Sequence, residues 1–238
     1  MDSCEKVESA VAAEVTRERG DVSHHRIVLL GPPGSGKGTA AQELSEVLGI
    51  AHVSTGQMFR EAARKGGPIG ESARQFIDKG QLVPDKITIE IVRMWLDEHA
   101  GGRGFIFDGF PRTRPQAEAF DALLAERGTP ITLAILLDVG EVEIFERILG
   151  RLSCERCGAL YHVSRMRPSR EGICDRCGGK LIRRADDNEA TIRERMRIYR
   201  DLTLGVIEYY EKSGVLKRVD GSGPKDKAFS AIMELVKS

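Results

Sequence analysis

The sequence predicts an α/β fold in which a five-stranded parallel sheet is flanked by helices. Short runs rich in Val, Ile and Leu recur at 26–30, 104–107, 132–137 and 215–219. Long charged, amphipathic segments separate these runs, and this alternation is typical of parallel strands covered by helices on both faces. A glycine-rich turn directly after the first run is the third observation, because such turns join a strand to a helix in folds of this class.

The first strand leads into the nine residues from Gly31 to Thr39, which read GPPGSGKGT. Glycines there let successive backbone N–H groups face one anion, the following helix adds its positive end, and Lys37 adds a mobile charge. The turn resembles the GxxxxGK[ST] pattern, except that Gly38 stands where Ser or Thr is usual. We therefore expect a nucleotide polyphosphate here, and a glycine turn without a ligand is the alternative.

The next elements extend the sheet. A helix ending at Gly49 precedes a weaker fifth strand at 51–54, and a helical, glycine-rich excursion follows at about 55–84. The strand Phe105-Ile106-Phe107 then ends in Asp108, which places a carboxylate at the ligand-binding edge of a parallel sheet. Asp108 could hold magnesium through water, and the alternative is an aspartate that only caps a turn or helix.

Two CxxC pairs lie within a second excursion, about 151–184. Cys154 and Cys157 form the first pair, Cys174 and Cys177 form the second, and residues 158–173 separate them. This spacing is typical of a closed, structural zinc site with four thiolate ligands. Reduced or disulfide-paired cysteines are the alternatives, although an intracellular location disfavours disulfides.

Arginines accumulate around these motifs. Single arginines usually lie on the solvated surface, but their number beside a phosphate loop favours a reaction that neutralises several phosphates at once. No Cys, Ser or His nucleophile with a partner is apparent, which suits phosphoryl transfer. The arginines concerned are Arg60, Arg112, Arg147, Arg151, Arg184 and Arg195.

Composition limits the remaining classes. The chain has 238 residues, 41% hydrophobic residues and a formal net charge of zero, so no global attraction to nucleic acid or an anionic membrane is expected. No run approaches the roughly 18 apolar residues of a membrane span, and the N-terminus lacks a signal-peptide pattern. We expect a cytoplasmic protein. Residues 1–25 are expected to form a mobile extension, with Cys4 a free thiol.

Together the motifs resemble those of adenylate kinases of the long-lid, zinc-binding type, within the nucleoside monophosphate kinases. The resemblance covers about 26–238. Besides the phosphate loop, it rests on STGQMFR at 54–60, DGFPRTRPQ at 108–116, CERCGALYH and CDRCGGKL around the cysteines, and RRADDNEATIRER at 183–195.

The resemblance implies a P-loop kinase fold with two insertions. Residues 26–54, 85–150 and 185–238 would form the core, 55–84 an AMP-binding insertion, and 151–184 a zinc-bearing lid. The implied reaction is reversible phosphoryl transfer from MgATP to AMP, giving two ADP and maintaining adenine nucleotide balance. Mg²⁺ and structural Zn²⁺ are the implied cofactors, and a monomer that binds neither membrane nor nucleic acid is expected.

The resemblance also assigns residues to each role. Catalytic residues would be Lys37, Arg112, Arg151, Arg184, Arg195 and Asp108. ATP would contact Gly34, Ser35, Gly36, Lys37, Gly38, Thr39, Arg147, Arg151, Leu160, Tyr161 and Gly223. AMP would contact Thr55, Arg60, Gln81, Leu82, Val83, Gly109, Phe110, Pro111, Arg112, Gln116, Arg184 and Arg195, with Gln116 reading the base. Asp186 and Asp187 would pair with arginines to close the lid or fix its hinge.

The sequence departs from the family pattern at two positions. Gln57 stands where an aspartate that supports hydrated magnesium is commoner, which puts magnesium affinity in question. Gly205 stands where proline is usual and is expected to loosen its helix.

Two other functions remain open. A UMP- or CMP-type kinase would share most of these motifs. A zinc ribbon that binds nucleic acid under nucleotide control is the alternative from another class, since 151–184 hold nine Lys or Arg against three Asp or Glu. Tyr161 is the only aromatic residue in that segment, which disfavours stacking on bases.

Overall fold

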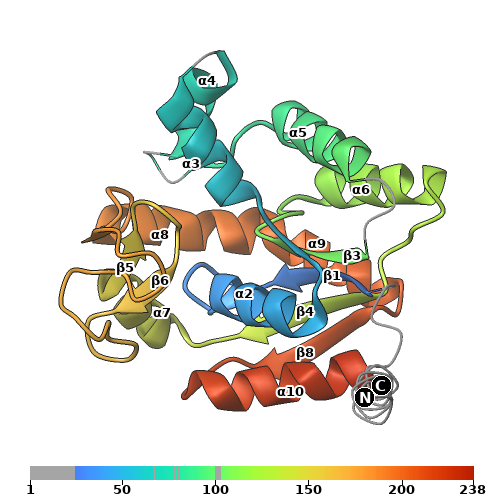
Figure 1. Ribbon diagram of the computed structural model, residues 1–238. Coiled ribbons are helices and arrows are strands. Elements are labelled where there is room, and N and C mark those ends of the chain that lie inside the picture. The colour runs from blue at the N-terminus through green and yellow to red at the C-terminus, as the bar shows by residue number, and fades with distance from the viewer. Residues whose placement is uncertain (1–24, 67, 78, 80, 100–102) are drawn as a thin grey trace, which may run out of the picture.

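The computed structural model describes residues 25–66, 68–77, 79, 81–99 and 103–238 (Figure 1). The predicted N-terminal extension, Cys4 included, lies outside these ranges apart from its last residue. Within the described ranges, no helix combines the length and apolar character needed to cross a membrane.

The central sheet has five parallel strands, as predicted, in the order β2-β3-β1-β4-β8. Leu29 pairs with Asp108 and Leu30 with Leu136, so β1, β3 and β4 end at the same edge. The four apolar runs and the weaker fifth strand are all confirmed. The strands are β1 (His25–Leu30), β2 (Ala51–Ser54), β3 (Gly104–Asp108), β4 (Leu133–Asp138) and β8 (Leu216–Asp220).

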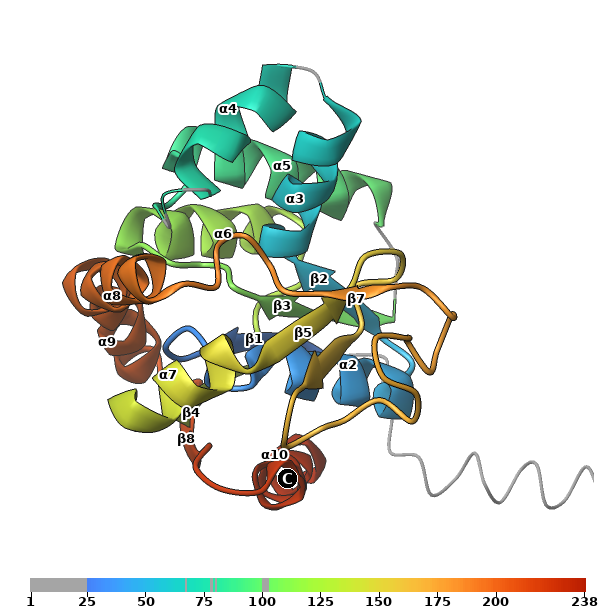
Figure 2. The ribbon, with the colours of Figure 1, turned by 90° about the vertical axis from the view of Figure 1, so that its left-hand side faces the viewer.

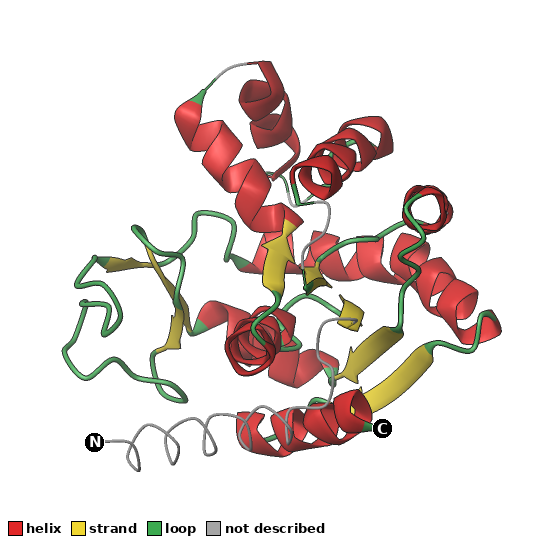
Figure 3. Ribbon diagram, turned by 45° about the vertical axis from the view of Figure 1, so that its right-hand side comes forward, coloured by secondary structure: helices red, strands yellow, loops and turns green. Residues whose placement is uncertain are grey.

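Alternate residues of the strands face opposite layers of helices. Ile27 and Leu29 of β1 pack with α2 (Lys37–Leu48) and α10 (Lys225–Lys237). Val28 and Leu30 pack on the other face with α5 (Asp85–Glu98), α6 (Arg114–Glu126) and α9 (Leu204–Lys212). Figure 3 shows helices on both sides of the strands. This two-sided burial explains why the strands read as continuous apolar runs.

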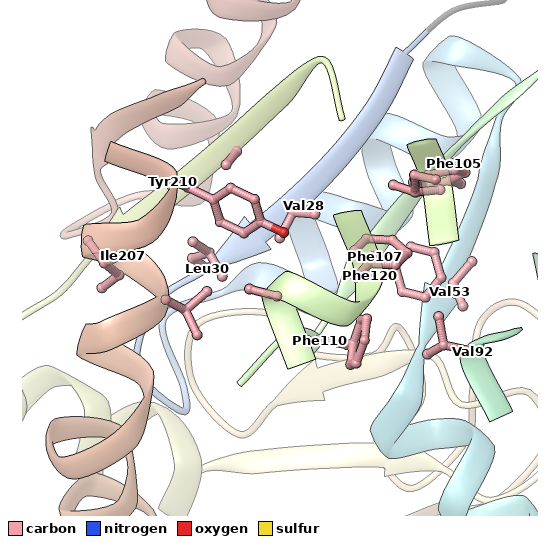
Figure 4. Close-up of a cluster of buried hydrophobic side chains, with 14 of the residues drawn as sticks. Val28, Leu30, Val53, Val92, Phe105, Phe107, Phe110, Phe120, Ile207 and Tyr210 are labelled. Atoms are coloured by element: carbon pink, nitrogen blue, oxygen red, sulfur yellow. The ribbon is translucent and has the colours of Figure 1, made fainter. Parts of the chain in front are cut away.

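Aromatic rings fill the layer under α5 and α6. Phe107 lies 4.9 Å from Phe120 and 5.8 Å from Phe110 between ring centroids (Figure 4). Both contacts are inclined, as aromatic pairs prefer. The cluster fixes the chain on either side of Asp108 and Gly109, which begin the loop after β3.

Two excursions leave the sheet, as the sequence predicts. The first contains α3 (Thr55–Lys65) and α4 (Pro68–Ile77), which stand at the top of Figure 1. The second follows α7 (Glu141–Leu149) and contains a small antiparallel sheet of β5 (Arg151–Cys154), β6 (Leu160–His162) and β7 (Leu181–Ile182). Figure 2 shows this small sheet in front of the central one.

The chain returns from the second excursion through α8 (Glu189–Ile198) and a five-residue π-helix, Tyr199–Thr203, into α9. Gly205 lies in the first turn of α9. The Thr203 hydroxyl donates to the Arg112 carbonyl at 3.1 Å, so the wide turn is tied to the loop after β3. A π-turn of this kind is often found at functional sites.

Candidate active site

A cavity of about 1070 Å³ lies at the carboxyl edge of the central sheet. Its walls come from the loops after β1, β2 and β3, from the α3–α4 excursion and from the small second sheet. Every predicted catalytic or nucleotide-binding residue except Phe110 lines it. Phe110 is 1% exposed and its ring points into the aromatic core (Figure 4), so its side chain takes no part in the cavity wall. Its contact with AMP stays a prediction.

The loop after β1 has the form predicted for a phosphate-binding turn. Gly34 and Gly36 have φ values of 79° and 98°, a region that suits glycine, and α2 begins immediately afterwards at Lys37. The Lys37 ammonium donates to the carbonyls of Gly31 and Pro32 at 2.8 and 2.7 Å. Burial lowers the Lys37 pKa to about 8, against the opposing attraction of Asp108. An ammonium held in this way is suited to meet an anion arriving at the loop.

Asp108 lies beside this loop, where the sequence places it. A Cβ atom at position 38 would lie 3.3 Å from the Asp108 carboxylate, so glycine in place of the usual Ser or Thr leaves this approach open. Burial opposes ionisation of Asp108, but His52, Lys37 and Arg112 together lower its pKa. The carboxylate is therefore ionised at neutral pH. It is chemically suited to hold the water shell of a divalent cation.

The cavity contains cations that the protein itself does not pair fully. The side chains of Arg60 and Arg184 have no hydrogen-bond partner among the described residues, although Asp186 attracts both electrostatically and Asp187 attracts Arg184. Burial first, then neighbouring arginines, lowers the Arg184 pKa to about 9 and the Arg112 pKa to about 10. These guanidinium groups remain charged at neutral pH. Their mutual repulsion in the cavity is relieved when a polyanion binds among them.

Two further arginines are held in ion pairs at the base of the small sheet. Arg151 Nε donates to Asp187 at 2.9 Å, and Arg195 pairs with Asp186. The side chains of Asp186 and Asp187 are 6% and 2% exposed. The predicted pairing of these aspartates with arginines is present. It fixes the segment where the chain leaves and re-enters the core.

Arg147 differs from the free cations because backbone carbonyls hold it. It donates to the carbonyls of Ser35 at 3.2 Å, Gly221 at 2.7 Å and Gly223 at 3.2 Å, and to the Glu143 carboxylate at 2.8 Å. Arg147 thus ties the phosphate loop to the turn after β8. Its guanidinium forms one wall of the cavity.

The other end of the cavity has a network of neutral donors and acceptors. The Thr55 hydroxyl donates to the Gly109 carbonyl at 3.0 Å. The Gln116 amide donates to Asp85 at 2.7 Å and accepts from the Arg112 backbone N–H at 2.8 Å. Gln81 and Leu82 line the same end, and Val83 lies 6% exposed beneath it. Polar groups fixed among apolar walls suit recognition of a nucleobase.

The four predicted cysteines converge. Their Sγ atoms lie within 4.8 Å of one another, with Cys154 to Cys177 at 3.4 Å and Cys157 to Cys174 at 3.6 Å. Thiolates about 2.3 Å from one tetrahedral ion lie nearly 4 Å apart, whereas a disulfide needs about 2.05 Å. The cluster fits a single metal ion and none of the four cysteines is in a disulfide.

Both CxxC turns have the same hydrogen bonds. The N–H of Gly158 donates to the Cys154 carbonyl at 3.0 Å, and that of Gly178 donates to the Cys174 carbonyl at 2.9 Å. Tyr161 packs between the turns, and its hydroxyl accepts from the Asp175 N–H at 2.8 Å. The hydroxyl is thus occupied within the small sheet. Leu160 and Tyr161 are the residues of β6 that, with His162, line the cavity.

The two excursions contact each other across the cavity. Arg64 of α3 donates to the carbonyl of Glu155, within the first CxxC turn, at 3.0 Å. Gln57 donates to Glu61 at 3.0 Å and approaches Gly158, where a Cβ would lie 3.2 Å from its amide nitrogen. Gln57, in place of aspartate, therefore faces the first CxxC turn as well as the cavity.

The sequence did not reveal three residues of the site. His52 lies 3.8 Å from Asp108, and its Nε2 is buried without a hydrogen-bond partner among the described residues. Glu143 accepts from Arg147 and Arg165. From the sequence, Asp85 cannot be distinguished from an ordinary acidic residue in the first turn of a helix. Position within strand 51–54, next to the strand that ends in Asp108, could have indicated His52, but no local pattern marks Glu143 or Asp85 as part of a site.

Comparison with known proteins agrees with this geometry. The family model for adenylate kinase matches residues 29–215. An adenylate kinase of Clostridium tetani is 46% identical over 210 residues, covering 88% of this chain and 97% of its own. An adenylate kinase of Archaeoglobus fulgidus is 46% identical over 215 residues, covering 89% and 99%. One from a Geobacillus species is 45% identical over 210 residues, covering 88% and 97%. The chain belongs to the adenylate kinase family.

Proposed function

We propose that the protein transfers the γ-phosphoryl group of MgATP reversibly to AMP, giving two ADP, and so balances adenine nucleotides. One observation carries the proposal: a phosphate loop and a set of incompletely paired cations line the same cavity as a neutral, base-sized pocket. A nucleotide hydrolase would need only the phosphate loop and the cations. A cavity that also has a second, base-sized pocket can hold a donor and an acceptor nucleotide together.

The donor ATP occupies the end formed by residues 34–39. Backbone N–H groups at the start of α2 and the Lys37 ammonium bind its phosphates. Arg147 and Gly223 border its base, and Leu160 and Tyr161 cover it from the small sheet.

The acceptor AMP occupies the other end. Arg60 and Arg112 bind its phosphate, and Thr55, Val83, Gly109 and Gln116 surround its base and sugar. In-line attack by an AMP phosphate oxygen on the γ-phosphorus needs no covalent enzyme intermediate. Lys37, Arg112, Arg151, Arg184 and Arg195 stabilise the charge that develops on the transferred group.

Closure of 151–184 over ATP and of 55–84 over AMP excludes water, so that the phosphoryl group meets AMP and is not hydrolysed. The contact between Arg64 and the Glu155 carbonyl joins these two segments and supports this assignment. The remaining ranges, 26–54, 85–150 and 185–238, form the core that holds both sites.

Two metal ions complete the proposal. Mg²⁺ supplies charge neutralisation to the ATP phosphates when bound, and Asp108 is the residue suited to hold its water shell. Cys154, Cys157, Cys174 and Cys177 hold Zn²⁺ with no open position, so the zinc contributes stability and no chemistry. We further propose a cytoplasmic monomer without nucleic-acid or membrane partners, since one chain supplies the whole cavity.

Product analysis by ³¹P nuclear magnetic resonance tests this function. From equal ATP and AMP, the proposal expects ADP as the sole product, with no inorganic phosphate, and the same equilibrium mixture when the reaction starts from ADP. Release of inorganic phosphate at a rate independent of AMP would instead indicate a nucleotide hydrolase or switch.

A further inference from the structure

We infer that Asp85 is a positioning residue that fixes the orientation of the Gln116 amide and thereby selects the base of the acceptor nucleotide. The inference deepens the proposed function and rests on it. Asp85 is the first residue of α5, does not line the cavity and must act through Gln116.

The Gln116 amide lies between two partners of opposite polarity. The backbone N–H of Arg112 can only donate, so the atom facing it at 2.8 Å is the amide oxygen. An ionised Asp85 carboxylate can only accept, so the atom facing it at 2.7 Å is the amide nitrogen. A reversed amide would place donor against donor and acceptor against acceptor in a side chain only 2% exposed.

Asp85 is itself held in place. Its second carboxylate oxygen accepts from the Thr113 hydroxyl at 2.9 Å. Thr113 in turn caps α6 by accepting from the Gln116 backbone N–H at 3.3 Å. The start of α5, the start of α6 and the Gln116 side chain therefore form one network, and Asp85 takes part in both of its hydrogen bonds between side chains.

A Gln116 amide held in one orientation distinguishes bases that an amide free to reverse would not. After these two bonds, Gln116 retains one acceptor site on its oxygen and one N–H on its nitrogen. Adenine presents an amino donor beside a ring acceptor, and a glutamine amide matches that pair in one orientation. The Watson–Crick edge of hypoxanthine presents a carbonyl acceptor beside a ring N–H, so it needs the amide reversed. Asp85 and the Arg112 N–H make that reversal costly.

Kinetics with AMP and IMP test the inference, because the two monophosphates differ only in the edge that the amide would read. The measured quantity is the selectivity, kcat/KM for AMP divided by kcat/KM for IMP. Asp85→Ala should lower it about tenfold, the worth of one hydrogen bond to a charged group. Asp85→Asn, which keeps an oxygen facing Gln116, should retain most of it. Glu90→Ala, an exposed charge removal on the same helix, should leave it unchanged.

A double mutant distinguishes positioning from general damage. In a Gln116→Ala background, Asp85→Ala should change the selectivity no further, because its effect passes through Gln116. Asp85→Ser, which keeps a residue favoured at helix starts, serves if the alanine variant does not fold. Unchanged selectivity in folded Asp85→Ala or Asp85→Ser, or an equal loss with and without Gln116, would overturn the inference. Absence of AMP phosphorylation by the unmodified protein would instead overturn the proposed function.

Discussion

The residues of the cavity concentrate positive charge where an anionic ligand can bind. Burial lowers the pKa of Lys37 to about 8, and it is the largest cause of the lowered pKa values of Arg60, Arg112 and Arg184. Each group is less favourably charged in the folded chain than in water. Keeping these groups charged therefore costs the folded protein free energy, and bound nucleotide phosphates offset that cost by stabilising the charged forms.

Replacement of Lys37 separates activity from stability. Lys37→Met should lower kcat by about three orders of magnitude, since it removes a charge that stabilises the transferred group. Between the folded pKa of about 8 and the ordinary value of 10.5, the unfolded chain binds more protons at Lys37 than the folded chain. The free energy of unfolding of the parent should therefore rise relative to that of the variant across this window, by roughly 3 kcal/mol.

Urea unfolding of both proteins without nucleotide, at several pH values from 7.5 upward, measures this difference. Below about 8 the lysine is charged in both states and the difference should be constant. A parent that loses stability relative to Lys37→Met across the window would contradict the buried-lysine interpretation.

Arg183 is a matched control for Arg184, because the two arginines are adjacent but differ in their position relative to the cavity. Arg184 lines the cavity, and its guanidinium has no hydrogen-bond partner among the described residues, whereas the adjacent Arg183 is exposed and does not line the cavity. Arg184→Ala should lower kcat at least about a hundredfold, as loss of one transition-state contact does. Arg183→Ala should change kcat less than about twofold, as expected of a surface charge. Steady-state kinetics and melting curves of both variants decide this, and equal effects would contradict the assignment.

At the scale of elements, hydrophobic patterning predicts the central sheet well. Two-sided burial makes its strands continuous apolar runs, and the glycine at position 49 adopts the left-handed conformation that ends α2. The small second sheet has no such signal. Its strands contain only four, three and two residues, and their pairing depends on the CxxC turns and not on apolar periodicity. The π-helix at 199–203 likewise follows from contacts of Thr203 with the loop after β3.

The cysteine cluster should act on stability. Cys154→Ser should abolish bound zinc and lower the melting temperature by several degrees, because the metal orders a segment too small for its own core. Turnover below that melting point should fall much less than for Arg184→Ala. Metal analysis and calorimetry measure both effects, with Cys4→Ser as a control for thiol loss outside the CxxC pairs. An unchanged melt with full zinc content would disprove the structural role.

At the scale of the molecule, the aromatic layer connects the core to the site. Phe107 has no exposed surface and contacts the rings of Phe105, Phe110 and Phe120. Phe107→Ala should lower the free energy of unfolding by about 3–5 kcal/mol, the usual cost of a large cavity. Met94→Ala, at a residue 48% exposed, should cost less than about 1 kcal/mol. Urea unfolding measures both, and similar losses would show that the layer is not the stabilising core.

Much of the site could be predicted because its ligands are bound by chain segments with local signatures. The phosphate loop, the carboxylate ending β3 and the paired cysteines each have a spacing set by one turn or strand end. His52 and Asp85 act through partners 28 to 56 residues away, so no short pattern contains both members. Glu143 pairs with Arg147 only four residues along the same helix, but such pairs are common on exposed helices and mark no site. Phe110 lies within the same signature motif as Arg112 although its ring packs in the core, and the motif alone does not distinguish these two positions.

The rate of ADP formation from ATP with AMP, CMP, UMP or GMP, each with and without magnesium, tests the central claim most directly. We predict rapid, magnesium-dependent ADP formation with AMP and far slower turnover with the other acceptors. Activity confined to CMP or UMP would contradict the claim and make the protein a pyrimidine nucleotide kinase. If none of the four acceptors supports ADP formation, the claim is contradicted entirely, and the result would indicate a protein that binds nucleotide without transferring phosphate.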